Sequence, residues 1–441
     1  MRRTLAEHQA AVAGLLRWSG GYDADSGEIL PLAEARGRVL AADIPAPVSL
    51  PPFDNSQMDG YAVHAEDLGQ ASPLVVVAPV AAGSVAPELL AGTAAPIMTG
   101  AMLPEGAAAV VPIERADPPS FYSSEDMRDG ERTVTLPDDV VAGAFVRRAG
   151  SDIAAGDVAV VAGTVLGPAQ LGLLAACGVS EVPVRSRFRV LLLSTGDEVA
   201  EPGAPLAPGT IYDANTTLLE AQLDEAGVEV TRHKLLGDDP AVLRDVLGNL
   251  ERGTTQLVLS TGGISQGAFE VVKQALADSS VEFSSVAMQP GGPQAHGTIS
   301  GVPFLGFPGN PVSAFVSFEM FLRPALQQLI GAPAPRPVLT AALTDPITSP
   351  PTKHQLRRGL YRQGHVSVVG GPDSHLLHAL ATANCLIHVP EGVADLAAGD
   401  TVEVTLFGPE PSNPFAVEDV MITEEAAPME PGSDDDTEKT S

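Results

Sequence analysis

The sequence predicts a multidomain protein with α/β and all-β parts: a central doubly wound α/β domain, an inserted β domain and a C-terminal β-barrel. Three observations predict this. From residue 187 onward, apolar strand-like runs alternate with helix-like segments, whereas residues 73–148 hold short valine-rich runs between Pro and Gly turns. A proline-rich stretch at 331–337 then precedes further short runs. Alternating strands and helices are typical of a parallel sheet. Closely spaced short strands are typical of β-sandwiches and β-barrels.

The α/β prediction depends on three apolar runs that each end in a Gly-rich loop. These runs are residues 188–193, 257–259 and 304–307, and the helices expected between them are 215–226, 240–250 and 269–278. Gly227 is suited to end the first helix, and Asp239 followed by Pro240 is suited to begin the second. Because ligands of open α/β sheets bind beyond the carboxyl ends of the strands, the three loops should meet at one crevice.

The other boundaries follow from caps and composition. Thr4 and Glu7 form a capping-box pattern that begins a helix running to Trp18, and a second short helix is expected from Pro31 to about Val39. The expected parts are a discontinuous helical N-terminal domain at 1–48 and 143–178, a β domain at 49–142, the α/β domain at 179–330, the barrel at 331–408 and an acidic, disordered tail at 409–441.

Charge and cysteine content exclude several classes of protein. Lys and Arg number 25 against 55 Asp and Glu, a net charge of −30, which opposes binding to nucleic acid or to an anionic membrane. Cys177 and Cys385 lie far apart, so neither a disulfide framework nor a thiolate metal site is expected. Glu7 and His8 interrupt any signal-peptide core, and every later apolar stretch is broken, so we expect a cytoplasmic protein without a membrane span.

Residues 51–63 form a first candidate site. Its polar members are Asp54, Asn55, Ser56 and Asp59, and its apolar members, which favour burial, are Phe53, Met58 and Tyr61. Carboxylates beside apolar anchors indicate a held geometry rather than a simple connector. An Asx-turn that caps the following strand is the alternative interpretation.

The Gly-rich loops of the α/β domain form a second candidate site. Small residues at Gly262, Gly263 and Gly309 would let backbone amides approach an anion, and Asn310 and Ser313 begin an apolar helix whose dipole favours negative charge. A single such loop is more often only a turn. Three in one domain favour a phosphate-bearing ligand.

Acidic side chains are frequent in the same loops. They are Asp197, Glu198, Asp213, Asp238, Asp239 and Glu270, with Asn215 beside them. Hard oxygen ligands of this kind suit Mg²⁺. Asn215 and Asp239 are also well placed as helix N-caps, whereas Glu198 caps no predicted helix. The histidines His64, His296 and His354 have no metal-ligand spacing, and packing roles are expected for them.

Six sequence blocks give the chain its resemblance to a known family. They are Pro-Phe-Asp-Asn-Ser-Gln-Met-Asp-Gly-Tyr-Ala-Val at 52–63, Ile-Met-Thr-Gly at 97–100, Ser-Thr-Gly-Asp-Glu at 194–198, Ile-Tyr-Asp-Ala-Asn at 211–215, Ser-Thr-Gly-Gly-Ile-Ser at 260–265 and Pro-Gly-Asn-Pro-Val-Ser at 308–313. In this order they resemble the molybdopterin molybdenumtransferases, the MoeA family that includes the C-terminal domain of gephyrin. The resemblance covers residues 1 to about 408.

The resemblance implies an elongated four-domain subunit that forms a homodimer, with a molybdopterin-binding α/β domain facing the Asp59 loop of its partner. Family members take adenylylated molybdopterin and molybdate, insert molybdenum at the dithiolene sulfurs and release AMP with Mg²⁺ assistance. A molybdopterin adenylyltransferase and the molybdoenzymes that accept the cofactor are the implied protein partners.

The resemblance also implies roles for individual residues. The implied catalytic acids are Asp59, Asp152, Glu198 and Asp238. The implied metal ligands are Glu198, Asp238 and Glu270, the last in place of a more usual Asp. The implied substrate-binding residues are Thr99, Arg147, Asp213, Asn215, Gly262, Gly263, Ser265, Gly309, Asn310 and Ser313.

One segment departs from the family pattern. Where the family typically has Lys-x-x-x-Lys-Pro-Gly-Lys-Pro, this chain has Ser285, Gln289 and Gly292 at the three lysine positions. Lysines at these places would give charge-assisted bonds to an oxyanion that the three neutral residues cannot give. The sequence therefore leaves two hypotheses open: an active molybdenum-inserting enzyme, or a catalytically silent paralogue that binds molybdopterin or a partner protein. An unrelated phosphate-binding α/β protein is a third, but it leaves residues 51–63 without a role.

Overall fold

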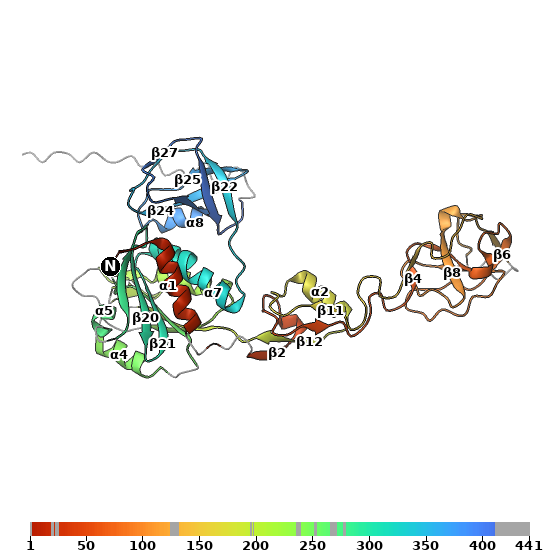
Figure 1. Cartoon of the computed structure of the whole chain (residues 1–441), viewed down its shortest axis with the longest axis horizontal. Coiled ribbons are helices and arrows are strands. Elements are labelled where there is room, and N and C mark those ends of the chain that lie inside the picture. The colour runs from red at the N-terminus through yellow and green to blue at the C-terminus, as the bar shows by residue number, and fades with distance from the viewer. Residues whose placement is uncertain are drawn as a thin grey trace, which may run out of the picture. The chain divides into compact units, whose positions relative to one another are not determined.

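The structure is a computed structural model that describes residues 2–18, 22, 26–123, 132–194, 196, 198–234, 240–250, 254–264, 271–276 and 279–410. It divides into two units, which are described separately here (Figure 1). One unit is Met1–Asp23 with Arg187–Ser441, and the other is Ala24–Ser186. The expected acidic tail lies outside the described residues, apart from its first two positions.

The first unit contains the predicted α/β sheet. Its seven strands lie in the order β1 (Arg2–Arg3), β18 (Glu282–Val286), β20 (Pro293–Ile299), β21 (Val302–Phe307), β17 (Leu257–Thr261), β13 (Arg189–Ser194) and β16 (Glu229–Lys234). Strands β16, β13, β17 and β21 run parallel, and β20 is antiparallel to β21. Every residue of β17 and β21 is buried, as expected for strands covered on both faces. The α/β prediction is confirmed, although the antiparallel β20 was not predicted.

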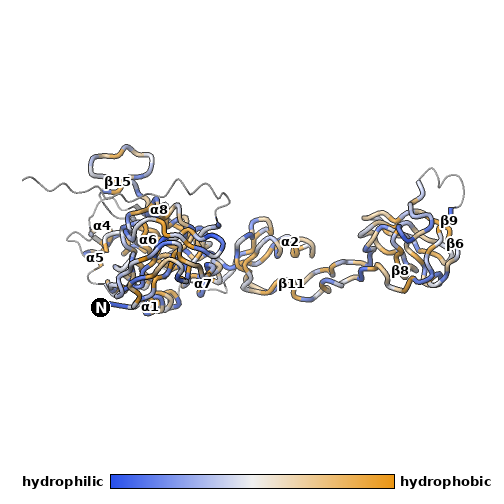
Figure 2. Tube along the Cα trace, turned by 90° about the horizontal axis from the view of Figure 1, so that it is seen from above, coloured by the Kyte–Doolittle hydropathy of each residue, from blue (hydrophilic) through white to orange (hydrophobic). Residues whose placement is uncertain are grey.

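Helices pack against this sheet and form its core. They are α1 (Leu5–Trp18), α3 (Ala214–Glu225), α4 (Pro240–Gly248), α5 (Val271–Ala275), α6 (Pro311–Ser317), a π-helix (Phe318–Leu322) and α7 (Arg323–Ile330). Alternate residues of β13, Leu191 and Leu193, lie in one apolar cluster with Leu243 and Leu247 of α4. Helix α6 is largely buried, with Val312, Ala314 and Val316 among its buried residues, and the part of Figure 2 around its label contains many hydrophobic segments.

The N-terminal helix belongs to this unit and not to the expected N-terminal domain. The capping box is confirmed, because the Glu7 amide donates to Thr4 Oγ1 (3.2 Å) and the Thr4 amide to Glu7 Oε2 (2.9 Å). However, β1 pairs with β18, and α1 packs against α7 and the π-helix. The apolar face of α1, including the fully buried Val12, is therefore covered by the α/β unit. Residues 1–23 accordingly separate from 24–48 and 143–178, and the other expected boundaries stay predictions.

The barrel predicted at the C-terminal end is present in the same unit. Its elements are β19 (Met288–Gln289), β22 (Val338–Leu343), β23 (Ile347–Thr348), β24 (His354–Arg362), β25 (His365–Val368), α8 (Leu377–Thr382), β26 (Cys385–Val389), β27 (Asp395–Leu396) and β28 (Thr401–Leu406). The order β24-β25-β22-β28-β26 closes because β26 pairs again with β24. The barrel core includes Val366, Ile387 and Val404. Strand β19 joins the barrel to the α/β domain, with Met288 paired to His354.

The second unit contains the predicted β domain. Its main sheet has the order β8 (Ala107–Pro112), β5 (Gly60–His64), β7 (Thr93–Ile97), β6 (Pro73–Val76) and β9 (Thr133–Thr135). The remaining elements are β2 (Gly27–Pro31), β3 (Ile44–Pro45), β4 (Asn55–Ser56), β10 (Val146–Arg147), β11 (Val158–Val160), α2 (Pro168–Ala176) and β12 (Glu181–Arg185). The strands expected near residues 75, 110 and 134 are therefore confirmed.

The helix expected from Pro31 to Val39 is wrong. Pro31 ends β2, which pairs along its whole length with β12, and only a short 3₁₀-helix follows at Leu32–Glu34. Pro31 itself has an extended conformation, with φ −54° and ψ 141°, because the sheet pairing continues up to this residue. Strand pairing with a distant segment outweighed the local helical preference, as tertiary context often does.

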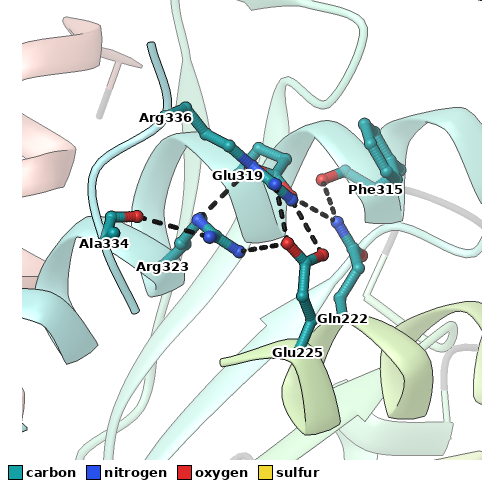
Figure 3. Close-up of polar contacts among 7 residues, drawn as sticks. All are labelled: Gln222, Glu225, Phe315, Glu319, Arg323, Ala334 and Arg336. Carbon is teal, nitrogen blue, oxygen red and sulfur yellow. Dashed lines mark hydrogen bonds and ion pairs between the residues drawn. The ribbon is translucent and has the colours of Figure 1, made fainter. Parts of the chain in front are cut away.

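A charged network holds the helices of the first unit to the linker that leads to the barrel (Figure 3). It consists of Gln222, Glu225, Glu319, Arg323 and Arg336. Arg336 contacts Glu319 through two bonds of 2.9 Å and Glu225 through bonds of 2.7 and 3.0 Å. Burial lowers the pKa of Arg336, but its bonds to the two carboxylates outweigh burial and raise that pKa overall. Every charge in the network therefore has an opposite charge beside it.

No helix among the described residues is long and apolar enough to cross a bilayer. Cys177 and Cys385 are both buried free thiols, and burial raises the pKa of Cys385 to about 12.

Candidate functional site

A cleft of about 950 Å³ opens at the carboxyl ends of β13, β17 and β21. The lining contributed by the three strand ends is Ser194, Gly196, Glu198, Thr261, Gly262, Gly263, Ile264, Pro308, Gly309 and Asn310. The predicted convergence of the three Gly-rich loops is therefore confirmed. Tyr212, Asp213 and Asn215 border the cleft as well, next to the segment β14 (Val199–Ala200) to β15 (Ile211–Tyr212), which projects from this unit in Figure 2.

Two of the loops touch each other through glycines. A side chain at Gly309 would bring its Cβ within 3.4 Å of the Gly262 Cα, and Gly262 has φ +87°. The Gly262 amide also donates to the Phe307 carbonyl at 3.1 Å. Glycine at both positions lets two loop backbones meet at the cleft, as expected for residues that admit a close approach.

The helix N-cap that the sequence suggested at Asn215 lies at Asp213. Asp213, not Asn215, is the N-cap of α3: its Oδ1 accepts from the Thr216 amide (2.9 Å) and its Oδ2 from Thr216 Oγ1 (2.6 Å). Asn215 instead donates from Nδ2 to the Gly309 carbonyl at 2.6 Å. Asp213 therefore stabilises a helix at the edge of the cleft, and Asn215 ties that helix to the loop after β21.

Glu198 is an acid of the cleft whose carboxylate has no described partner. Its side chain is exposed, and none of the described hydrogen bonds or ion pairs involves its carboxylate. The carboxylate lies over Gly196, where an added Cβ would come within 2.7 Å of Glu198 Oε2. A carboxylate in a cleft without a protein partner is available to a cation or a ligand.

The three neutral residues at the positions where the resemblance implies lysines also border the cleft. They are Ser285, Gln289 and Gly292. Gln289 Oε1 accepts a hydrogen bond from Gln355 Nε2 at 3.2 Å, and the Gly292 carbonyl accepts from the Val286 amide at 2.7 Å. This wall of the cleft is therefore polar but uncharged.

The barrel supplies a wall that sequence reasoning missed. Its cleft-lining residues include Lys353, Asp373 and Ser374. Ser374 Oγ accepts from Asn310 Nδ2 at 2.6 Å, and the buried Arg358 donates to the Asp373 carbonyl at 3.1 Å. Burial lowers the pKa of Arg358 to about 10. These residues lie in barrel loops distant in sequence from the strand ends, and no local pattern marks them.

A second group of predicted residues lies on the other unit. Asp59 Oδ1 accepts from both the amide and the hydroxyl of Thr99, each at 2.7 Å, and these bonds lower the pKa of the exposed Asp59. A Cβ at Gly60 would lie 2.0 Å from the Val111 carbonyl oxygen, so the next position has to be glycine. Tyr61 is fully buried as expected, but Met58 is 37% exposed, so it is no anchor.

Asp152 and Arg147 border the same loop. The Asp152 amide donates to the Leu50 carbonyl at 3.0 Å, and Arg147 pairs with Asn55 between β10 and β4. Both side chains are exposed. The unit thus presents Asp59, Thr99, Arg147 and Asp152 on neighbouring loops, while the remaining described candidates line the cleft of the first unit.

Three predicted residues, Asp238, Ser265 and Glu270, lie outside the described residues, as do Asp197 and Asp239. Within the described ranges no three His, Cys, Asp or Glu side chains gather so that they could hold a metal ion. The metal set predicted from the sequence therefore stays a prediction.

Comparisons with known proteins place the fold and the cleft in a family. Residues 3–178 match the MoeA N-terminal region (domain I and II), residues 191–328 a probable molybdopterin binding domain, and residues 340–407 the MoeA C-terminal region (domain IV). Molybdopterin molybdenumtransferase 2 of Mycobacterium tuberculosis is 43% identical over 418 residues, covering 91% of this chain and 99% of that protein. This chain belongs to the MoeA family.

Further relatives support the same family assignment. The molybdopterin molybdenumtransferase of Haemophilus influenzae is 36% identical over 389 residues, which cover 86% of this chain and 94% of that protein. The crystal structure of the molybdopterin biosynthesis MoeA protein from Pyrococcus horikoshii superimposes with a TM-score of 0.75 at 28% identity, covering 92% of this chain and all of the other. The MoeA assignment makes the chain a transferase of molybdenum cofactor biosynthesis. Its cleft is bordered by both the molybdopterin binding region and the MoeA C-terminal region.

Proposed function

We propose that this MoeA protein inserts molybdenum from molybdate into adenylylated molybdopterin and releases AMP with the help of Mg²⁺. The observation that carries the proposal is the cleft, where three Gly-rich strand ends converge beside the carboxylate of Glu198, for which the described residues provide no hydrogen bond or ion pair. Its volume of about 950 Å³ is at the upper end of the range for small-molecule sites, which suits a nucleotide-linked ligand. The two free, buried cysteines support a reducing, cytoplasmic setting.

The loops would bind the anionic part of the ligand. The close backbone approach at Gly262 and Gly309 lets amides face a phosphate without an intervening side chain. Asn215 and Ser374 both hold the Gly309–Asn310 turn, through bonds of 2.6 Å each. A loop held in this way keeps its donors in place before the ligand arrives, which favours binding.

The donor chemistry fits Mg²⁺. Mg²⁺ is usually bound by one or two carboxylates together with substrate phosphates and water. Glu198 offers one such carboxylate, whereas both Asp213 oxygens are already used by Thr216. We assign Asp238 and Glu270 as the further ligands. When bound, the ion would supply positive charge to the phosphoanhydride, and Glu198 would hold it at the cleft.

We propose that Asp59 and Asp152 act on the cleft of a partner subunit. The two bonds from Thr99 lower the pKa of Asp59 and fix its exposed carboxylate, which can then orient a water molecule. Apolar side chains on the same unit, including Ile29, Val158 and Val161, are exposed in the single chain and would gain from being covered in a homodimer. Asp59 would then complete a site in the second subunit.

Subunit mixing tests this arrangement. Asp59→Asn and Glu198→Gln should each fold normally and lose activity about 100-fold, because each removes a charge and keeps the shape. A dimer that combines the two variants holds one intact site, so an equal mixture should recover about a quarter of wild-type activity by random pairing. Each variant mixed with itself is the control, and no recovery in the mixture contradicts a shared site.

AMP release tests the activity itself. Purified protein given adenylylated molybdopterin, molybdate and Mg²⁺ should release AMP, and chelation of the metal should slow the release. A flat trace at saturating substrate rejects the enzymatic proposal.

A catalytically silent, ligand-binding role is the second candidate. The uncharged wall of Ser285, Gln289 and Gly292 favours it, because lysines at these places would have bound an oxyanion. Calorimetry separates the two functions: tight binding of molybdopterin without turnover supports the second, and turnover excludes it. The molybdopterin adenylyltransferase and the acceptor molybdoenzymes are the proposed protein partners in either case.

A further inference from the structure

We propose that Gln294 is a positioning residue of the cleft: its buried side chain holds the turn at 289–292 in the shape that the ligand requires. The turn borders the cleft, whereas Gln294 itself is not among the residues that line it. The role rests on the function proposed above, because the ligand is the one assigned there. Gln294 acts through the turn and touches no reacting atom.

Two hydrogen bonds from Gln294 Nε2 join this turn to helix α6. One goes to the Gly291 carbonyl at 2.8 Å, and the other to Ser317 Oγ at 2.7 Å. Ser317 Oγ in turn donates to the Ser313 carbonyl at 2.7 Å. Gly291 and Ser313 both border the cleft. Gln294 and Ser317 therefore connect two segments of the lining from within the fold.

The partners of the Gln294 amide determine its orientation. A carbonyl can only accept, and Ser317 Oγ already gives its hydrogen to Ser313, so both contacts require the nitrogen of the amide. The oxygen Oε1 is then left without a described partner, although Gln294 is only 2% exposed. A buried amide with an unpaired oxygen weakens a fold relative to an apolar side chain of the same size. Packing therefore does not explain this residue, whereas support of the turn does.

Glycine lets the turn lie directly against Ser317. Gly291 has φ +95°, and a Cβ there would come within 2.7 Å of Met288 Cε and 3.2 Å of Ser317 Oγ. At the next residue, the Gly292 carbonyl accepts from the Val286 amide at 2.7 Å. The backbone of the turn is thus held at Gly291 by Gln294 and at Gly292 by the end of β18.

The backbone of the turn offers hydrogen-bond donors at a wall whose side chains are uncharged. Gly291 and Gly292 both border the cleft, and neither amide donates to another described residue. Successive amides in a turn with a left-handed residue can form a concave set of donors for a polar or anionic group. The direction of these donors depends on the shape of the turn. A loosened turn should therefore weaken ligand binding and leave the chemical step nearly unchanged.

Hydrogen exchange of the full-length protein tests whether Gln294 holds the turn. Gln294→Met keeps the length of the side chain and removes both donated bonds. The Val286 amide should then exchange about 10-fold faster, because its acceptor lies in the turn. Ser284→Ala is the matched control and should exchange as the wild type does. Ser284 is buried opposite Gln294 in the β18–β20 pairing, and its Oγ has no described partner, so this change alters the same face of the sheet without removing a described bond to the turn.

Isothermal titration tests the effect on ligands. With molybdate alone, and separately with AMP and Mg²⁺, Gln294→Met should weaken at least one anion about 10-fold relative to Ser284→Ala. Ser317→Ala removes one of the two acceptors and should weaken the same anion by less. The variant with both changes should lose no more than Gln294→Met alone, because the bonds form one network. Ser317→Ala carries the same tests by itself if Gln294→Met fails to fold.

Turnover separates a positioning role from a general loss of structure. In the AMP-release assay, Gln294→Met should raise KM about 10-fold for the substrate that contacts the turn and keep kcat within about 2-fold of the wild type. The role is overturned if Gln294→Met matches Ser284→Ala in both binding and KM, or if Val286 exchanges equally in the two variants. A fall in kcat at unchanged KM also overturns it, because a smaller folded fraction would produce that result.

These outcomes are separable from those of the function itself. Turnover by the wild type with no effect of Gln294→Met on binding or KM rejects only the role of Gln294. Binding that depends on Gln294, in a protein that never releases AMP, supports the role of Gln294 and rejects the enzymatic function.

Discussion

Acidic side chains have opposite surroundings in the charged network and in the cleft, although both regions lie in the same unit. In the network, Glu319 is almost fully buried, with 2% of its side chain exposed, and it contacts Arg336 at 2.9 Å while Gln222 donates to it at 3.1 Å. In the cleft, Glu198 is exposed and has no described partner. The comparison separates an acid that holds the fold from one that is free to bind.

The physical reason lies in desolvation. A buried carboxylate is tolerated only when opposite charge and hydrogen bonds replace its water, and Arg336 together with Gln222 provides this for Glu319. An exposed carboxylate keeps its water and needs no partner. Glu198 can therefore exchange water for a cation when a ligand binds, at little cost to the fold.

The same substitution at the two acids gives the largest expected contrast. Glu319→Gln should lower the free energy of unfolding by about 3 kcal/mol, because it leaves buried arginine charge uncompensated. Glu198→Gln should leave the free energy of unfolding within about 0.5 kcal/mol of the wild type, since it changes an exposed site. Urea unfolding of the full-length chain measures both.

The rate of AMP release should change in the opposite way to the free energy of unfolding. Glu319→Gln should keep AMP release near the wild-type rate at a temperature where it is folded, whereas Glu198→Gln should not. Glu225→Gln is the control of intermediate burial, with half of its side chain exposed, and should fall between the two in stability. Equal destabilisation by Glu198→Gln and Glu319→Gln would contradict the distinction between the two regions.

The sequence could predict what depends on local pattern. Thr4 and Glu7 mark the start of α1, and the three Gly-rich strand ends locate the cleft, because both signals lie in a few adjacent residues. It could not predict Lys353 or Ser374, which reach the cleft only because β19 pairs with β24 and the barrel is closed.

Competition between similar residues explains the other errors. Asp213 and Asn215 are both good N-caps by residue type. In the structure Asp213 caps α3, and Asn215 donates to the distant Gly309 carbonyl, a contact that no local pattern reveals. Met58 is as apolar as Tyr61, but it lies in the exposed turn before β5, whereas Tyr61 lies within that strand. The local sequence pattern therefore located the cleft at the strand ends, whereas pairing between distant segments determined which other residues border it.

Buried histidines give a third environment, in which charge is avoided. His8 is 1% exposed, its ring packs on Phe321, and burial, followed by the nearby His296 and Arg3, lowers its pKa to about 3. His388, which contacts His354 at 3.0 Å, has its pKa lowered to about 4, again mainly by burial. No described carboxylate forms a hydrogen bond or ion pair with either histidine, and each stays neutral in the fold.

Acid should therefore destabilise the protein through these histidines. An unfolded histidine takes up a proton near pH 6.5, whereas folded His8 does so only near pH 3, so stability is lost as the pH falls between these values. The wild type should lose about 1.4 kcal/mol more per pH unit in that window than His8→Gln does. Chemical unfolding at pH 6, 5 and 4 measures the difference, and parallel pH curves for the two proteins would contradict it.

The smallest change in the free energy of unfolding is expected for an ion pair whose two side chains are exposed to water. Arg115 and Asp139 in the β domain form such a pair, with 43% and 67% of their side chains exposed. Water already solvates both ions, so Arg115→Ala should lower the free energy of unfolding by less than about 1 kcal/mol, and salt should abolish the coupling that a double-mutant cycle with Asp139→Ala detects. A coupling as large as that of Glu319 with Arg336 would show that pairing alone, and not burial with pairing, determines which acids hold this fold together.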